Sequence, residues 1–170
     1  MALPQLLKNF NLFLEGEGYA GRATEITLPK LARKMEEFDA GGMLGPIDID
    51  MGQEKLEAEI TLAEFSRKVL ETYGIASADG VQMRFKGAAV NDGTTSATDA
   101  IEIVMRGRYK EIDMGTVKRG ENAPMKLSAS LTYYKYVLNG EDIIEIDMVN
   151  MIFVVNGVDR MEEMSEALGL

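Results

Sequence analysis

The dipeptide Asn139-Gly140 lies between two strand-like runs, and it constrains the fold more than any other feature of the sequence. Residues 124–138 precede it and residues 141–155 follow it, and both runs are rich in β-branched and aromatic residues. Asn-Gly suits a type I′ turn because both central residues of that turn have φ above zero. The sequence therefore predicts a long β-hairpin, which the strand-like run Thr98–Asp113 extends to a three-stranded meander.

Composition limits the chemistry that this chain can perform. Its 170 residues include no Cys and no His, and the formal net charge is −10. Without histidine, Ser–His and Cys–His nucleophile pairs and His-ligated metals are excluded. The negative charge disfavours nonspecific binding to nucleic-acid phosphates. The longest apolar runs are too short for a bilayer, so we expect no membrane anchor.

Three glycines near the N-terminus match the dinucleotide-binding pattern G-x-G-x-x-G, namely Gly16, Gly18 and Gly21. That pattern binds pyrophosphate only where a helix begins at the glycines. The residues that follow are strand-like up to Pro29, so we interpret the glycines as a hairpin turn. Further strands are expected at residues 10–14, 19–28, 55–60 and 80–90.

One amphipathic helix is predicted at residues 61–73. Thr61 and Glu64 have the spacing of a capping box. Its apolar stripe consists of Leu62, Phe65, Val69, Leu70 and Tyr73. A shorter helix is expected at residues 159–168, with Asp159 as its N-cap. One substantial helix among many strands predicts an α+β, mainly β fold: an antiparallel β-sandwich or barrel with one flanking amphipathic helix.

Residues 39–52 combine four glycines and a proline with apolar side chains. The segment is either a loop with a short strand or a projecting arm whose apolar side chains are buried only against a neighbouring subunit. The Asp48-x-Asp50 spacing suggests calcium ligands, but the segment lacks the spacing of an EF-hand loop, so we predict no metal site. The candidate contact residues of the arm are Gly41, Gly42, Met43, Leu44, Ile47, Ile49 and Met51.

Strict alternation divides the meander into two faces. One face of residues 124–138 carries Leu127, Ala129, Leu131, Tyr133, Lys135 and Val137, and the other carries Ser128, Ser130, Thr132, Tyr134 and Tyr136. Glu145 and Asp147 alternate with apolar residues in the strand that follows. The meander is therefore expected to have an apolar side and a polar side that faces water.

Short segments along the chain carry a family resemblance. They are NLF (11–13) with Gly16 and YAG (19–21), ITLPKL (26–31), GGM (41–43), MRGRYKEID (105–113), EID (145–147) with Asn150-Met151, NGVDR (156–160) and LGL (168–170). In this order and spacing, over essentially the whole length, the chain resembles the major tail tube protein of contractile-tailed phages and the related tube of R-type bacteriocins. It departs most from the family at residues 91–97 and 162–166.

The chain length predicts a single domain over residues 1–170, with the arm or loop at 39–52, the helix at 61–73, the meander at 98–155 and a C-terminal tail at 156–170. The resemblance implies hexameric rings that stack into a hollow tube, with the inner sheets of six subunits joined into one continuous barrel. It implies no catalytic residue and no cofactor. The implied partners are other copies, the tail sheath protein, baseplate and tail-terminator proteins, and DNA that passes through without specific binding. The implied location is the virion tail, assembled in the bacterial host cytoplasm.

Self-assembly also fits the physics of the sequence, because an exposed strand edge is a template for another chain and head-to-tail contacts either close into rings or propagate. The arm and the chain end are the candidate subunit contacts, the latter through Asn156, Asp159, Arg160 and Leu170. The candidate lumen-facing residues are Ser128, Ser130, Thr132, Glu145 and Asp147.

Three functions remain open at this stage. The first is the tail tube of a complete phage, which conducts DNA into the host cell. The second is the tube of a headless R-type bacteriocin, which punctures and depolarises target cells. The third is a carboxylate-using enzyme or ligand-binding barrel, which would need a concave pocket with convergent acids. The absence of histidine and the scattering of acids along strand faces weigh against the third.

Overall fold

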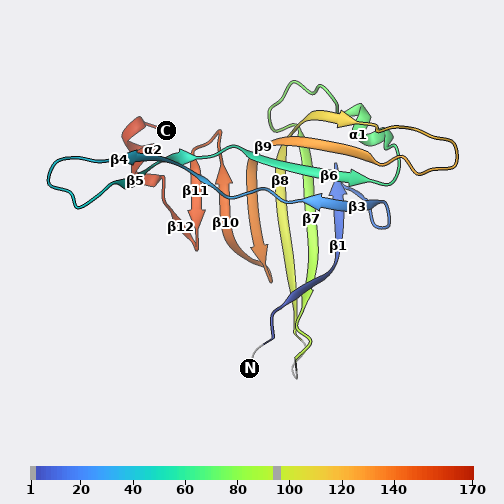
Figure 1. The fold of residues 1–170 in the computed structure, drawn as a ribbon, viewed down its shortest axis with the longest axis horizontal. Helices are drawn as coiled ribbons and strands as arrows, with labels where there is room; N and C mark the ends of the chain where they lie inside the picture. Colours follow the sequence, from blue (N-terminus) through green and yellow to red (C-terminus); the bar gives the residue numbers. More distant parts are fainter. Residues whose placement is uncertain (1–2, 94–96) are drawn as a thin grey trace.

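The computed structural model describes residues 3–93 and 97–170, most of them in antiparallel strands (Figure 1). The strands are β1 (Leu6–Leu14), β2 (Glu17–Gly18), β3 (Ala23–Thr27), β4 (Arg33–Phe38), β5 (Ile47–Gln53), β6 (Leu56–Leu62), β7 (Val81–Val90), β8 (Thr98–Asp113), β9 (Met125–Leu138), β10 (Glu141–Asp147), β11 (Ile152–Val155) and β12 (Val158–Asp159). The helices are α1 (Arg67–Glu71) and α2 (Glu162–Leu168), and neither is long enough to cross a membrane. Residues 94–96, within the predicted loop 91–97, lie outside the described residues.

Strand β9 divides the sheet into two layers because two different strands share one of its edges. Residues 125–131 of β9 pair with β6, and residues 133–138 pair with β10. Strand β8 pairs with β9 along its other edge throughout. The four-stranded layer consists of β3, β6, the first half of β9 and the second half of β8. The main layer contains β1, β7, the first half of β8, the second half of β9, β10 and β11. Figure 1 shows the two layers running in different directions.

The hydrophobic core lies between these two layers. The main layer contributes Leu12, Leu14, Val81, Met83, Phe85, Ile103 and Met105, all of them buried. The four-stranded layer contributes Leu56, Ile60, Leu62, Leu127, Ala129 and Leu131 to the same cluster. The apolar positions alternate along β6, β7 and β8, which is the pattern of strands with one buried face. The mainly β, antiparallel fold that the sequence predicts is confirmed, but the helix expected at 61–73 is shortened to α1, so both helices are short.

A β-bulge at Thr132 reverses the alternation of β9, and the predicted faces of its second half are wrong for that reason. Arg106 pairs with Tyr133 and Gly107 pairs with Leu131, so Thr132 is the extra residue. Beyond it, Tyr134 is buried and Tyr136 packs on the core. A one-residue insertion moves every later side chain to the opposite face. Tyr133, Lys135 and Val137 therefore leave the core face on which strict alternation placed them.

The predicted helix at 61–73 is wrong over its first half. Thr61 and Leu62 belong to β6, where Thr61 pairs with Lys126. Glu64 forms an ion pair with Arg22 and does not close a capping box. Helix α1 begins only after Ser66 and buries a single residue, Val69. Pairing with β9 thus overrides the local capping signal.

The strand predicted over residues 141–155 is two strands. β10 ends at Asp147, whose carboxylate accepts hydrogen bonds from the backbone N–H groups of Val149 and Asn150 and so fixes a turn. β11 begins at Ile152. The strand predicted over 19–28 is similarly reduced to β3, and Phe10–Leu14 extends backwards to Leu6.

Both expected glycine turns are confirmed. Asn139 and Gly140 have φ of 51° and 81°, as a type I′ hairpin requires. Gly16 has φ of 78° in the turn between β1 and β2, and a strand follows it where a nucleotide site would need a helix. A second Asn-Gly turn at Asn156-Gly157 joins β11 to β12, and the sequence reasoning missed it although the signal is the same.

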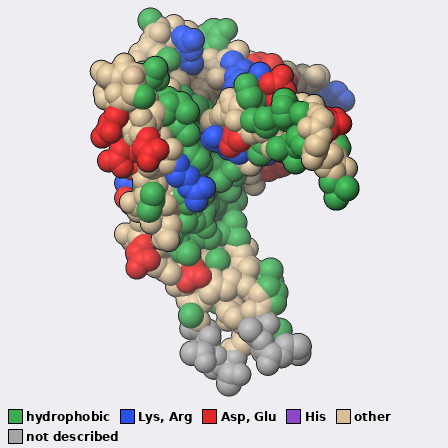
Figure 2. All heavy atoms as spheres, turned by 90° about the vertical axis from the view of Figure 1, so that its left-hand side faces the viewer, with side chains coloured by type: hydrophobic (Ala, Val, Ile, Leu, Met, Phe, Trp, Pro, Cys, Tyr) green, Lys and Arg blue, Asp and Glu red, His purple; other side chains and the backbone are tan. Residues whose placement is uncertain are grey.

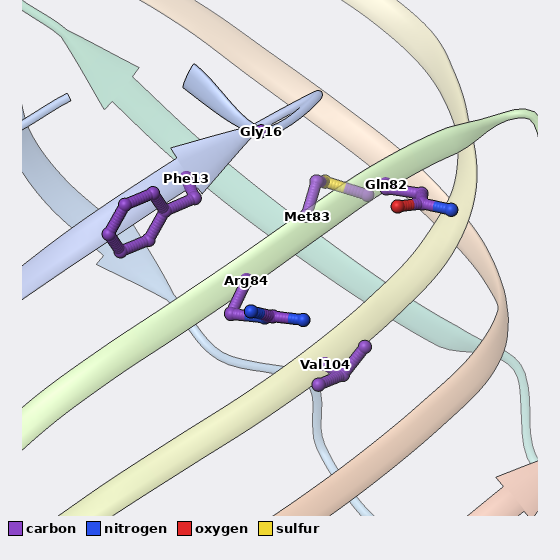
Figure 3. Close-up of a pocket in the computed structure, with 6 residues that line it drawn as sticks. All are labelled: Phe13, Gly16, Gln82, Met83, Arg84 and Val104. Atoms are coloured by element: carbon purple, nitrogen blue, oxygen red, sulfur yellow. The ribbon is translucent and has the colours of Figure 1, made fainter. Parts of the chain in front are cut away.

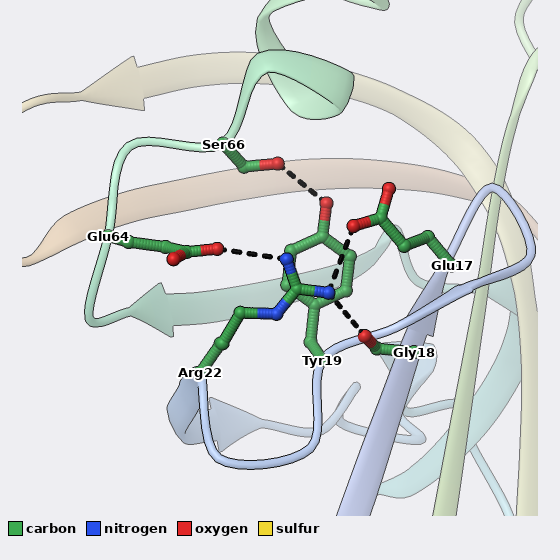
Figure 4. Close-up of polar contacts among 6 residues, drawn as sticks. All are labelled: Glu17, Gly18, Tyr19, Arg22, Glu64 and Ser66. Atoms are coloured by element: carbon green, nitrogen blue, oxygen red, sulfur yellow. Dashed lines mark hydrogen bonds and ion pairs between the residues drawn. The ribbon is translucent and has the colours of Figure 1, made fainter.

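Arg22 ties the first turn to the region before α1 (Figure 4). Its guanidinium donates to the carboxylates of Glu17 and Glu64 at 2.9 and 3.0 Å and lies 4.3 Å from the ring centre of Tyr19. The fully buried Tyr19 has its hydroxyl 2.6 Å from that of Ser66, which is also buried. Burial raises the pKa of the Tyr19 phenol. These contacts hold the segment that leads from β1 to β3 against the end of β6.

Gly107→Ala is predicted to destabilise the fold strongly. A Cβ at this position would lie 2.1 Å from the carbonyl oxygen of Ser130 and 2.8 Å from the Cα of Leu131, so backbone must move. We expect a loss of about 3 kcal/mol in the free energy of unfolding, measured by urea denaturation. Gly41→Ala is the control, since a Cβ there meets nothing within 4 Å, and an equal loss in both variants would contradict the prediction.

Tyr19→Phe is predicted to cost about 1–2 kcal/mol of stability, because it leaves the buried hydroxyl of Ser66 without its hydrogen bond. Tyr73→Phe is the matched control, since Tyr73 is 62% exposed and should change stability by less than about 0.5 kcal/mol. Chemical denaturation of both variants compares them, and equal effects would show that the Tyr19–Ser66 bond contributes nothing.

Candidate assembly surfaces

The four-stranded layer ends in an open strand edge on each side. β3 pairs with β6 along one edge, and no backbone hydrogen bond of the described chain reaches residues 24–27 from the other side. β7 leaves β8 at Gly107, so among the described strands only β9 pairs with residues 108–113. Unpaired N–H and C=O groups in a row are a template for another strand. The layer is therefore incomplete on both sides in a single copy.

The outward face of this layer is polar. Ser130 lies between Glu57 and Arg108 in the strand register, and Ser128 lies between Glu59 and Glu111. The ammonium of Lys110 donates to Glu57 at 2.7 Å, and this hydrogen bond is the main cause that lowers the pKa of the Glu57 carboxyl to about 2. Acidic, hydroxyl and basic side chains thus cover the side of β6 and β9 that faces away from the core, with Lys126 on the same face as Ser128 and Ser130.

The five predicted lumen-facing residues do not lie on one flat face. Ser128 and Ser130 are on the four-stranded layer, and Thr132 is at the bulge where β9 bends. Glu145 and Asp147 are on β10 in the main layer. Glu145 accepts a hydrogen bond from the Tyr133 hydroxyl at 3.1 Å, whereas Asp147 holds the turn after β10. The bend of the sheet separates the two groups, which could not be seen from alternation.

The arm is a two-stranded β-hairpin of β4 and β5 that projects from one end of the molecule (Figure 1). It carries all seven candidate contact residues of that segment: Gly41, Gly42, Met43, Leu44, Ile47, Ile49 and Met51. Leu44 at the tip is fully exposed, and Ile47, Ile49 and Met51 are exposed on β5. Figure 2 shows hydrophobic side chains gathered on the side of the molecule from which the arm projects. The hairpin fits the projecting-arm alternative better than a loop with a short strand, and the burial of its apolar side chains against a neighbouring subunit stays a prediction.

Asp50 in the arm is held by contacts within its own hairpin. Its carboxylate accepts hydrogen bonds from the Arg33 guanidinium at 2.8 Å and from the N–H of Gly52. The contact with Arg33 lowers the pKa of Asp50. Among the residues that the structure describes, no group of three or more acidic side chains is placed to hold a metal ion.

The C-terminal candidates lie around β12 and α2. Asp159 accepts hydrogen bonds from the N–H groups of Phe153 and Met161, so it joins β11 to the helix; α2 begins after Met161, and the N-cap role predicted for Asp159 is wrong. The N–H of Arg160 also donates to the carbonyl of Phe153. Asn156 forms the turn before β12. Helix α2 buries none of its residues, and Leu170 is exposed beyond it.

Sequence reasoning missed an exposed surface at the end of the molecule opposite the arm. Phe65, Leu70 and Tyr73, which the predicted helix would have buried, are exposed around α1. Met114 and Val117 are exposed in the β8–β9 connection. No local pattern marked this surface, because residues 115–124 are mostly polar and the residues around α1 fit a helix with a buried face.

The cavity in Figure 3 has a volume of about 290 Å³ and lies over β1, β7 and β8. Its lining side chains include Phe13, Gln82, Arg84 and Val104. None of the lining residues is a carboxylate. An acid–base enzyme without histidine would need paired acids in such a pocket, so this cavity gives the enzyme interpretation no support.

Comparison with known proteins identifies the family. The model of the family described as phage tail tube protein FII matches residues 4–169. The tail tube protein of Escherichia phage P2 is 43% identical over the full length of both chains. The major tail tube protein of Serratia phage KSP20 is 33% identical over all of this chain and 99% of its own.

Solved structures agree with this fold at low sequence identity. A chain of the sheath/tube terminator of an extracellular contractile injection system (PVC) matches 79% of this chain and 96% of its own, with a TM-score of 0.58 and 8% identity. A chain of the sheath–tube complex of that system matches 79% of this chain and 90% of its own, with a TM-score of 0.57. The relatives that define the family are structural tail proteins and not enzymes, as expected. The chain therefore belongs to the family of phage tail tube proteins.

Proposed function

We propose that this protein forms hexameric rings that stack into the hollow inner tube of a contractile tail, and that this tube conducts DNA into the host cell. The observation that carries the proposal is the four-stranded layer with an open edge on each side. Strands β3, β6, β9 and β8 alternate in direction, so β8 of one copy would lie antiparallel to β3 of the next copy in the same orientation. Repeating this contact around an axis gives one continuous antiparallel barrel.

In this arrangement the polar face of the four-stranded layer lines the lumen. Ser128 and Ser130 belong to that face, together with Glu57 and Glu59. Lys55 and Lys110 neutralise Glu57, Glu59 repels phosphates and the hydroxyls bind them weakly, so DNA would slide without being held. Thr132, Glu145 and Asp147 from the predicted set lie at or beyond the bend of β9. We assign them to the outer part of the tube or to subunit contacts.

The proposed partners follow from the family. They are further copies of the chain, a tail sheath protein around the tube, and baseplate and tail-terminator proteins at its two ends. The proposed location is the virion tail, with assembly in the cytoplasm of the bacterial host. Both curated relatives are phage proteins, which supports DNA conduction over the alternative of a headless bacteriocin tube.

Met43→Asp/Leu44→Asp is predicted to leave a folded protein that forms no tubes, because the apolar tip of the arm would be replaced by charge. Circular dichroism measures the fold, and negative-stain electron microscopy measures assembly. Met43→Leu/Leu44→Met keeps the apolar character and should assemble like the wild type. Normal tubes from the double Asp variant would exclude a role of the arm tip in assembly.

Ser130→Cys is predicted to react in the assembled tube with a small maleimide but not with a large polyethylene-glycol maleimide. A lumen admits the small reagent and excludes the large polymer, whereas both should react with the unassembled subunit. The chain has no other cysteine, so the mass of the product reports this position alone. Equal reaction of both reagents in the tube would place Ser130 on the outside.

A further inference from the structure

We propose that the arm of one subunit docks on the opposite end of a second subunit, in the next ring, at a surface that we call the far-end patch. The far-end patch consists of Phe65, Lys68, Leu70, Tyr73, Met114, Val117, Lys118 and Arg119, from α1 and its flanks and from the β8–β9 connection. This inference rests on the proposed tube, and it names the surface that receives the arm.

The two surfaces lie at opposite ends of the same layer. The arm continues from β3 and β6 at one end of the long axis, and α1 and the β8–β9 connection lie at the other end (Figure 1). Copies joined through the open edges of β3 and β8 share one orientation, so the arms of a ring all point toward one end and the patches toward the other. Stacked rings would therefore bring arms against far-end patches.

Both surfaces expose apolar side chains that their own chain leaves uncovered. On the arm, Leu44 is fully exposed and Met35 and Phe38 are about half exposed. On the patch, Val117 is 67% exposed and Tyr73 is 62% exposed. Apolar surface of this extent at both ends of a long molecule is typical of contact sites. Burying the arm tip against Tyr73 and Val117 would remove both surfaces from water.

The arm and the far-end patch carry opposite charges. Glu37 and Asp48 lie directly opposite each other in the β4–β5 register, which places two like charges side by side. Such a pair is destabilising unless a cation neutralises it. No ion pair with either residue occurs in the part of the chain that the structure describes.

The far-end patch supplies cations that are not engaged elsewhere. Lys68, Lys118 and Arg119 make no ion pair with any described residue, whereas Arg22, Arg33 and Lys110 are each bound to carboxylates. Two cations in the β8–β9 connection match the two carboxylates of the arm. Because exposed ion pairs contribute little affinity, we assign binding strength to the apolar contact and orientation to the charges.

The contact is head-to-tail, since the arm and the patch are different surfaces of the same chain. A heterologous contact along an axis does not close and so propagates without limit. Because each subunit has one arm, each subunit of a ring would make one such contact with the next ring. Ring formation and ring stacking would then depend on separate surfaces, which can be tested separately.

A cysteine-pair experiment tests the proximity of the two surfaces, and the absence of native cysteine makes it clean. Leu44→Cys and Val117→Cys proteins are mixed, assembled and treated with a mild oxidant. We expect a disulfide-linked dimer that appears only after assembly. Leu44→Cys mixed with Leu6→Cys is the control, since Leu6 is exposed on β1 away from the patch. Equal linkage in the control mixture would overturn the proposal.

A charge-swap experiment tests the pairing itself. We expect Lys118→Glu/Arg119→Glu, and separately Glu37→Lys/Asp48→Lys, to form rings but to need about tenfold more protein to stack. The chain that carries all four substitutions should regain stacking, because the charges are exchanged and not lost. Normal stacking of each double variant, or no recovery in the fourfold variant, would overturn the docking site. Wild-type protein that forms neither rings nor tubes would instead overturn the proposed function.

Discussion

The division of one edge of β9 between two strands determines the shape of this protein. Because β6 takes the first half of that edge and β10 takes the second, β9 must turn from one layer into the other within a single strand. The bulge at Thr132 absorbs the turn, and Gly107 on β8 allows the backbones to approach where any Cβ would collide with Ser130. Both layers, the core between them and the open edges of the four-stranded layer follow from this one arrangement.

Local signals in the sequence predicted much of the fold. Asn139-Gly140 specified the hairpin, and the strand Thr98–Asp113 was predicted to the residue. The bulge escaped prediction because Tyr133 and Tyr134 are adjacent aromatic residues, so either register places a tyrosine in the core. The helix at 61–73 failed because Thr61 and Leu62 have a stronger partner in β9 than in a helical turn. A capping box is a local preference, and a seven-residue ladder outweighs it.

The candidate surfaces were predictable only where composition alone marked them. Glycines and apolar side chains marked residues 39–52 as either a loop or an arm, and the choice between them required the β4–β5 hairpin of the structure. Correct prediction of the lumen-facing residues required knowledge of the bend of β9. This bend separates Ser128 and Ser130 from Glu145 and Asp147. Prediction of the far-end patch required knowledge that α1 is short, because a longer helix would have buried Phe65 and Tyr73. A turn can be predicted from neighbouring residues, whereas a contact between distant segments cannot.

The even number of strands in the four-stranded layer has a consequence for the number of copies in the proposed ring. With four strands in alternating directions, each added copy restores the direction of the first, so backbone pairing permits a barrel of any number of copies. Backbone hydrogen bonds between neighbouring copies therefore do not determine how many copies form a ring. In the proposed ring, the number of copies would be set by the angle at which one layer meets the next, which depends on sheet twist and on the wedge shape that the packed core gives the subunit. A substitution that alters this wedge would change the bore of the tube while leaving every strand paired.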